Sequence, residues 1–272
     1  MILGVDVGNT CIKMAILEDD VKRIDLLLPT RSMEEYCGDD FDDDCGTLEE
    51  ALDNIKEEHP NISSILISCV DNDMLGMAVA IFDEFFGIKP KAIRNSMIPI
   101  KNKYKDKKQL GVDRLLCAYS AKSFYESPLI LIDSGSATTY DVVSKEAFEG
   151  GVIAPGLDIF TFTLLQSTKI QIDPMKLIEM QNTPKDFGIA NFTEAGIVSG
   201  MEHYVLGGTL SIIKEYEDIL NDFSSIVLTG GSSEFIYNVI KDISWPYKVH
   251  YDPDLLFKGM HLLVKNKEKN RK

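Results

Sequence analysis

Small polar residues follow the first apolar run of the chain, in the order Asp6-Val-Gly8-Asn9-Thr10. Glycine lets a backbone approach a phosphate closely, and the amide and hydroxyl donors beside it bind phosphate oxygens. A carboxylate such as Asp6 is a suitable ligand for Mg²⁺, and Lys13 in the next strand could reach a phosphate. The turn therefore has the residue types of a phosphate-binding loop, although a plain Asp-Gly hairpin turn explains the same pattern.

A carboxylate stands beside an arginine in Gly111-Val112-Asp113-Arg114, where apolar spacing predicts that a helix begins. The charge of Arg114 and the helix dipole both favour the anion, so we expect Asp113 to stay ionised. An ionised carboxylate could accept the proton of a hydroxyl group as that group attacks. The alternative is structural, because Asp favours helix starts and often forms only a surface ion pair there.

The opening pattern is repeated in the second half of the chain. An apolar run again ends in Asp-x-Gly, at Asp133, and the small residues Ser136, Ala137 and Thr138 lead into another apolar run. These residues form a second candidate phosphate-binding loop, and the repeat indicates two similar, duplicated domains.

The duplication sets the expected domains and elements. We assign the N-terminal domain to residues 1–117 and the C-terminal domain to residues 118–272. Apolar and β-branched runs predict strands at 2–7, 11–17, 62–70 and 225–228. Helical spacing predicts helices at 49–58, 74–86, 111–125, 162–166 and 200–216. The last of these strands ends in a glycine turn at Gly230, which is a weak indication of nucleotide binding on its own.

Composition excludes several classes of function. The chain has 43 acidic and 28 basic residues, a net charge of -15, so we expect no nucleic-acid partner. Its five cysteines form no C-x-x-C pair, which indicates a reducing compartment without a disulfide framework. We find no signal peptide and no apolar stretch of the ~20 residues that span a membrane, so we expect a cytoplasmic protein without membrane contact. The acidic run at residues 39–44 is interpreted as a solvated loop, with a metal site as the weaker alternative.

The motifs occur in a fixed order along nearly the whole chain: D-x-G-N-T, G-x-D-R, D-x-G-S-A-T-T-x-D, G-G-x-I-A-P-G and T-G-G. This order resembles the type III pantothenate kinase family, in the superfamily of acetate and sugar kinases, hsp70 and actin. The resemblance implies an α/β fold of two duplicated domains with ribonuclease H-like mixed sheets and an ATP cleft between them. It implies ATP-dependent phosphorylation of the primary hydroxyl of pantothenate, the first committed step toward coenzyme A. It also implies Mg²⁺, a monovalent cation such as K⁺ or NH₄⁺, and a homodimer.

The resemblance also assigns roles to individual residues. It places ATP and phosphate binding at Asp6, Gly8, Asn9, Thr10, Lys13, Ser136, Ala137, Thr138 and Gly230. It places the bound substrate against Tyr104, Gly111, Val112, Asp113, Arg114 and Thr193. Within these sets, Asp113 is the implied catalytic base, and Thr193 is the threonine that reaches the substrate of the partner subunit. Asp133 is the implied ligand of the monovalent cation, and Asp6 that of Mg²⁺, directly or through water.

Several positions depart from the family's usual pattern: Lys107, Ser136, Phe160 and Phe192. Most of these departures concern the substrate and dimer side, so they bear on the identity of the acceptor more than on kinase chemistry. Three alternatives follow: another small-molecule kinase of the superfamily, a non-catalytic regulator, and an ATPase of the hsp70 or actin type. The retained carboxylates argue against the regulator, and the short chain argues against the ATPase.

Five lysines surround Tyr104 in a short loop: Lys101, Lys103, Lys105, Lys107 and Lys108. They could attract the pantothenate carboxylate or ATP toward an otherwise acidic protein. A simple solvated loop is an equally good interpretation.

Overall fold

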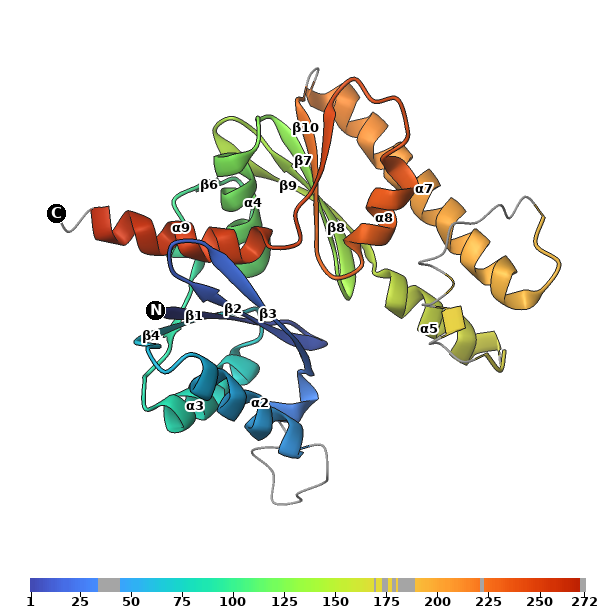
Figure 1. Cartoon of the computed structure of the whole chain (residues 1–272). Helices are drawn as coiled ribbons and strands as arrows, with labels where there is room; N and C mark the ends of the chain where they lie inside the picture. The colour runs from blue at the N-terminus through green and yellow to red at the C-terminus, as the bar shows by residue number, and fades with distance from the viewer. Residues whose placement is uncertain are drawn as a thin grey trace. The chain divides into compact units, whose positions relative to one another are not determined.

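A computed structural model of the chain describes residues 1–33, 45–168, 170–172, 176–177, 180, 189–220 and 223–269 (Figure 1). The chain divides into two compact units. The first comprises Met1–Ser120 and Asp254–Lys272, and the second comprises Ala121–Pro253. Cys37 and the acidic run at residues 39–44 lie outside the described residues. Cys117 is buried, and Cys11 and Cys69 are partly buried.

The first unit contains a mixed five-stranded sheet in the order β3-β2-β1-β4-β5. Its strands are β1 (Ile2–Val7), β2 (Cys11–Leu17), β3 (Val21–Pro29), β4 (Ser64–Cys69) and β5 (Lys91–Ala92). β1 is antiparallel to β2 and parallel to β4, so it occupies the centre of the sheet. This arrangement brings the ends of β1 and β4 to the same edge, where the first candidate loop begins.

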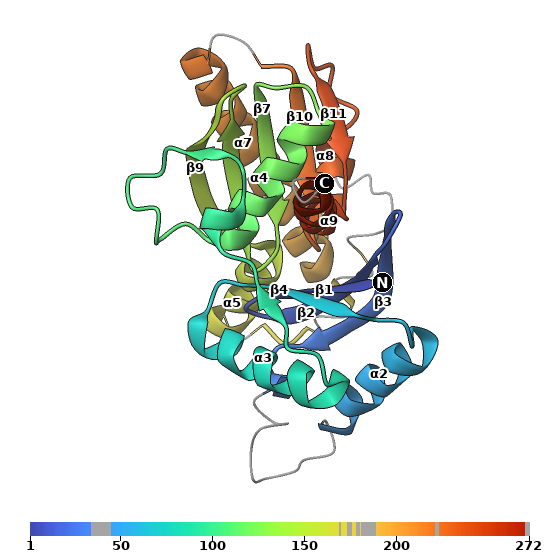
Figure 2. The same cartoon turned by 90° about the vertical axis from the view of Figure 1, so that its left-hand side faces the viewer.

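The side chains of β1 alternate between the face of the sheet that forms the core and the face that carries Asp6. Leu3, Val5 and Val7 are buried in a cluster with side chains of α2 (Cys45–Glu58) and α3 (Asn72–Phe86). Both helices lie against this face of the sheet (Figure 2). Because successive side chains of a strand point to opposite faces, Asp6 lies on the other face.

The C-terminal helix α9 (Leu255–Lys269) covers that other face in the first unit. A Cβ atom on Gly4 would lie 3.0 Å from the sulfur of Met260, and a Cβ on Gly259 would lie 2.8 Å from the carbonyl oxygen of Leu116. The assignment of α9 to the second domain is therefore corrected: α9 groups with the first unit, where it packs on β2 and on the part of α4 (Val112–Phe124) that precedes Ala121.

The second unit repeats the topology of the first. Its strands are β7 (Leu129–Ser134), β8 (Ala137–Val143), β9 (Ala147–Pro155), β10 (Ser225–Thr229) and β11 (Lys248–Tyr251), and they follow the order β11-β10-β7-β8-β9. β7 is antiparallel to β8 and parallel to β10, as β1 is to β2 and β4. The expected α/β fold with duplicated mixed sheets is confirmed by this strand-by-strand correspondence.

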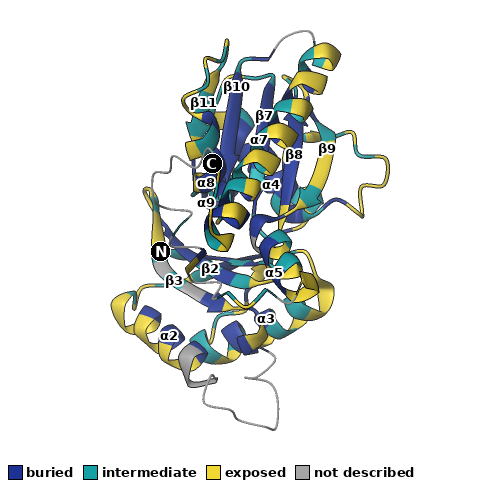
Figure 3. Ribbon diagram, turned by 90° about the vertical axis from the view of Figure 1, so that its right-hand side faces the viewer, coloured by how far each residue is buried: buried dark blue, intermediate teal, exposed yellow. Residues whose placement is uncertain are grey.

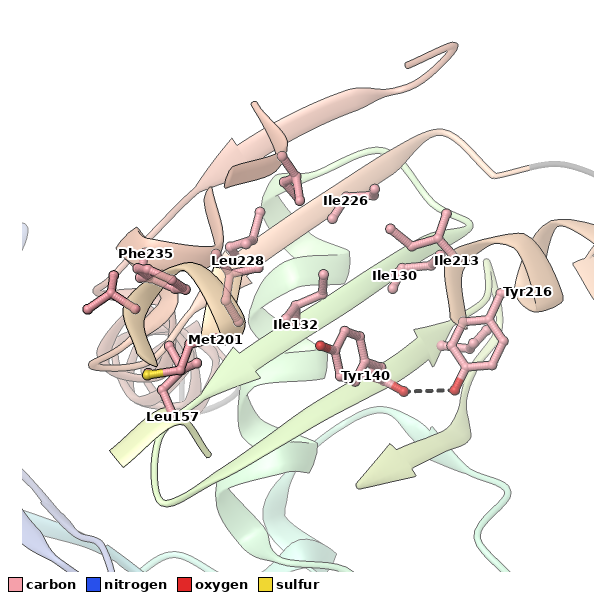
Figure 4. Close-up of a cluster of buried hydrophobic side chains, with 14 of the residues drawn as sticks. Ile130, Ile132, Tyr140, Leu157, Met201, Ile213, Tyr216, Ile226, Leu228 and Phe235 are labelled. Atoms are coloured by element: carbon pink, nitrogen blue, oxygen red, sulfur yellow. Dashed lines mark hydrogen bonds between the residues drawn. The ribbon is translucent and has the colours of Figure 1, made fainter. Parts of the chain in front are cut away.

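The core of the second unit lies between its sheet and the helices α5 (Leu157–Thr168), α7 (Thr193–Leu220) and α8 (Ser233–Ile240). Buried residues concentrate in β7, β8 and β10, whereas much of α7 is exposed (Figure 3). Ile130, Ile132 and Tyr140 lie within this core, where the hydroxyl of Tyr216 donates a hydrogen bond to the backbone oxygen of Tyr140 at 2.9 Å (Figure 4). The polar groups of these large aromatic residues are thus satisfied inside the core.

Among the described residues, no helix combines the length and apolar character needed to cross a membrane.

Candidate active site

Three side chains meet at the end of β1. Asp6 stands in register with Lys13 of β2 and with Ser68 of β4. Ser68 is fully buried, whereas Asp6 and Lys13 are partly exposed. The strand pairing thus places Asp6 between a lysine and a hydroxyl group at the edge where the first candidate loop begins.

The environment of Asp6 raises its pKa to about 7. Burial is the largest cause, because protein surrounds the carboxylate although part of the residue is accessible, and the negative charge of Asp113 adds to it. Lys13 and Ser68 oppose the shift without cancelling it. Two carboxylates that are far apart in the sequence therefore lie close together, which neither motif alone indicates.

Asp113 is located at the start of α4, and the backbone N–H of Arg114 donates a hydrogen bond to its Oδ1 at 2.8 Å. We expected Arg114 and the helix dipole to hold this carboxylate in its ionised form. Burial raises the pKa of Asp113 and outweighs the lowering effects of Arg114, so the net shift is upward from the usual range of a carboxyl group. A raised pKa makes the carboxylate a better proton acceptor.

The residues that the sequence groups with Asp113 do lie around it. A Cβ atom on Gly111 would overlap the Asp113 carboxylate and lie 3.2 Å from Val70. The guanidinium of Arg114 lies 5.7 Å from the centre of the Tyr104 ring, within cation–π range. Val112 is buried, so its side chain belongs to the core and any contact with a substrate would come from its backbone.

The β1–β2 turn is open to solvent but fixed by backbone contacts. Asn9 and Thr10 are exposed, and the N–H of Gly8 donates to the carbonyl of Cys11 at 3.0 Å. The hydroxyl of Thr30 donates to the carbonyl of Gly8 at 2.7 Å. The turn thus presents polar groups from a defined backbone, as a phosphate-binding loop requires.

In the second unit, two glycines pack against Asp133 and the loop that follows it. A Cβ on Gly156 would collide with the backbone of Gly135 and Ser136. A Cβ on Gly230 would collide with the Asp133 carboxylate, and Gly230 has a φ of 96°, which favours glycine. The glycine-rich motifs are therefore parts of one assembled loop cluster.

Hydrogen bonds hold this cluster together. The hydroxyl groups of Ser134 and Thr138 lie 3.1 Å apart, and the N–H of Ser232 donates to the carbonyl of Ser134 at 2.9 Å. Thr138 is buried and Ala137 is exposed, so only part of the predicted set faces solvent. Oxygen atoms of Asp133 and its neighbours gather here, and hard cations prefer oxygen ligands.

Thr193 stands at the start of α7, in a groove of about 410 Å³ that none of the Asp133 loop residues lines. The residues that share the groove are mainly apolar: Phe160, Leu164, Gly196, Ile197, Gly200, Met201 and Tyr204. Phe160 and Tyr204 contact each other with ring centres 5.3 Å apart. Within its own unit, Thr193 therefore belongs to an apolar surface rather than to a phosphate loop.

The carboxylates of the first unit suit Mg²⁺. Mg²⁺ is usually held in kinases by one or two carboxylates together with phosphates and water, and Asp6 supplies one such carboxylate. In the described part of the chain, no group of three or more His, Cys, Asp and Glu residues could hold a metal by itself. The donor set thus fits a metal that arrives with a nucleotide.

Sequence reasoning missed two residues of this site. Ser68 lies in register with Asp6, and Val70 contacts the position of Gly111. Both lie at or just beyond the end of β4, whose sequence reads as an ordinary buried strand. Polar residues at the ends of the parallel strands β1 and β4 could have indicated this site, because the ends of adjacent parallel strands meet at one edge of a sheet.

Comparisons with known proteins identify relatives over most of the chain. The chain is 31% identical over 243 residues to a type III pantothenate kinase of Persephonella marina. This match covers 87% of this chain and 89% of that protein. It is 28% identical over 279 residues to a type III pantothenate kinase of Agathobacter rectalis, covering 100% of this chain and 99% of that protein.

Solved structures share the fold. A Campylobacter jejuni protein assigned to the Baf family matches with a TM-score of 0.58 and 17% identity, over 98% of this chain and 99% of that one. The ethanolamine utilization protein EutJ of Carboxydothermus hydrogenoformans matches with a TM-score of 0.51 and 14% identity. The match covers 96% of this chain and 89% of that one. The sequence model of the type III pantothenate kinases matches residues 2–215, and the chain belongs to that family.

Proposed function

We propose that the protein phosphorylates the primary hydroxyl of pantothenate with ATP, giving 4′-phosphopantothenate in the first step of coenzyme A biosynthesis. Family membership over residues 2–215 supports the substrate and the reaction. The observation that carries the chemistry is the placement of Asp113 beside Asp6, with the pKa of both carboxylates raised.

In the proposed reaction, Asp113 orients the acceptor hydroxyl and takes its proton. The hydroxyl oxygen forms a bond to the γ-phosphorus as the bond from that phosphorus to the β,γ-bridging oxygen breaks, and ADP leaves. Arg114 and Tyr104, which contact each other, flank the acceptor. Most of the rate enhancement comes from positioning, as in other phosphoryl transfers.

The phosphates of ATP are assigned to the two loops of the duplicated topology. Gly8, Asn9, Thr10 and Lys13 supply donors from the first, and the Ser136–Thr138 segment with Gly230 supplies them from the second. Asp6 would hold Mg²⁺, directly or through water. Mg²⁺ neutralises charge on the transferred phosphoryl group.

Asp133 is proposed to bind the monovalent cation, K⁺ or NH₄⁺. Its carboxylate lies against Gly230, close to the backbone oxygen of Ser134, so an oxygen-rich environment is present at the end of β7. A cation there would help to order the γ-phosphate.

A homodimer is proposed through the face of α5 and α7. Large apolar side chains are exposed on and next to these helices: Ile159, Phe162, Ile189, Phe192 and Tyr204. Tyr204 is 73% exposed although its ring packs on Phe160. An apolar surface of this kind is typical of a protein interface, and burying it would place Thr193 near the partner subunit.

One observation favours a different acceptor as the second candidate. Phe160, one of the departures from the usual family pattern, lines the groove that contains Thr193. ADP release should therefore be measured with Mg-ATP and pantothenate, and with other small alcohols in its place. Release that depends on pantothenate supports the proposal, release with another alcohol supports the second candidate, and no release with any acceptor supports a regulatory homologue.

A further inference from the structure

The loop before α4 concentrates positive charge on an acidic protein. This segment consists of the short strand β6 (Lys101–Asn102) and the loop that continues to residue 108. It contains five lysines and one aspartate, and all five lysine side chains are exposed. The whole chain carries a net charge of -15. An anion approaching most of the surface is repelled, whereas this loop attracts it within a Debye length of roughly 10 Å.

Hydrogen bonds give the loop a defined shape. The N–H of Tyr104 donates to the side chain of Asn102 at 2.8 Å, and the N–H of Lys108 donates to that of Asp106 at 3.0 Å. The side-chain amide of Asn95 donates to the carbonyl of Leu110 at 2.8 Å. The lysines are therefore attached to a fixed backbone.

The loop leads directly to the acceptor side of the candidate site. Tyr104 lies among the lysines, and its ring packs against Arg114. The loop ends at Leu110, which is buried, and at Gly111, which contacts Asp113. Its path into α4 can be followed as the blue-green trace in Figure 2.

We propose that Lys105, Lys107 and Lys108, with Lys101 and Lys103, form an electrostatic guide that captures the carboxylate of the acceptor and directs its hydroxyl end toward Asp113. The inference rests on the proposed function, because it names the acceptor charge that the loop recognises. ATP is the less suitable target, since the proposed phosphate site has its own cation, Lys13 of β2, which is close enough to Asp6 to lower the pKa of that carboxyl.

A matched pair of variants tests the guide. Lys105→Gln, Lys107→Gln and Lys108→Gln are combined in one protein. The control combines Lys22→Gln, Lys89→Gln and Lys91→Gln, which change the net charge equally. These three lysines are also exposed and belong to the first unit. Lys22 is paired with Ile16 of β2 and Lys91 with Leu66 of β4, and neither partner belongs to the candidate site. kcat/KM for pantothenate is measured at saturating Mg-ATP, with K⁺ held constant and ionic strength raised with choline chloride.

For the wild type and the control we expect kcat/KM for pantothenate to fall as ionic strength rises. In the loop variant we expect kcat/KM to be lower by about 3- to 10-fold at low ionic strength and nearly independent of salt, with kcat and the KM for ATP unchanged. Replacing the three lysines by arginine should restore the wild-type values. Equal losses in the loop variant and the control would overturn the guide, as would a loss expressed only in the KM for ATP. Failure of the proposed function itself is distinct, because the wild type would then show no pantothenate-dependent ADP release.

Discussion

Asp113 lies close enough to Asp6 for its negative charge to raise the pKa of Asp6, although the two residues belong to different elements of the first unit. Burial acts in the same direction on both carboxylates. A pair of this kind is unfavourable for the folded protein on its own and favourable once a cation arrives. The site is therefore built for ligand binding at a cost in stability.

Replacing Asp6 by Asn should stabilise the ligand-free protein above neutral pH. The folded protein holds the Asp6 proton up to about pH 7, whereas the ordinary pKa of an aspartate side chain is 3.8. Between these values the folded state binds more protons than the unfolded state, so its stability falls as pH rises. We expect a gain on the order of 1–3 kcal/mol at pH 8 and almost none near pH 4, measured by thermal melting. A variant that is no more stable than the wild type at pH 8 would contradict the buried carboxylate pair.

Replacing Asp113 by Asn should remove turnover and leave nucleotide binding in place. The amide keeps the size of the side chain but cannot accept the hydroxyl proton, so kcat should fall by about 10²- to 10⁴-fold. Calorimetry with Mg-ADP should give an affinity close to that of the wild type. Full turnover in the variant would remove Asp113 from the mechanism.

Replacing Gly111 by Ala should displace the Asp113 carboxylate, because the added Cβ atom would occupy the same space. We expect kcat/KM for pantothenate to fall by at least about 10-fold, as misplacement of a catalytic group typically causes. Gly76→Ala is the control, since Gly76 is exposed in α3 with no atom near its Cβ position. That change should stabilise the helix by about 0.5–1 kcal/mol and leave kcat/KM unaltered. Wild-type kinetics in Gly111→Ala would show that the carboxylate does not depend on this glycine.

Charge on the exposed face of α5 and α7 should separate the proposed dimer. A protein that combines Phe162→Lys and Tyr204→Lys should sediment as a monomer and lose pantothenate-dependent activity, because Thr193 would no longer reach a partner subunit. Phe124→Lys serves as the control: this aromatic residue is 53% exposed at the end of α4, outside the groove. A wild-type protein that is monomeric at micromolar concentration, yet active, would refute this interface.

Regular strands and the duplicated motif could be predicted from the sequence, because β1, β2, β4, β7 and β10 are nearly continuous apolar runs. β3 could not, since Lys22 and Arg23 interrupt its apolar pattern. The helix α9 was not predicted, because Gly259 stands among its apolar residues, and its membership of the first unit depends on tertiary packing.

In the candidate site, too, some features could be predicted from the sequence and others depend on tertiary packing. Asp6 and Asp113 were found from motif and position, but their proximity comes from the sheet and from the placement of α4. The raised pKa of Asp113 depends on burial, which competes with the nearby Arg114 and wins. Charge neighbours can be read from a sequence, whereas desolvation requires the fold.

The central claim is transfer of the γ-phosphoryl group to the hydroxyl of pantothenate. The most direct measurement is mass spectrometry of pantothenate after incubation with the purified protein, Mg-ATP and K⁺, with Asp113→Asn as the parallel sample. The account predicts a phosphate monoester of pantothenate, formed in step with ADP, by the wild type and not by the variant. Unmodified pantothenate in the wild-type sample, with or without ADP release, would contradict it.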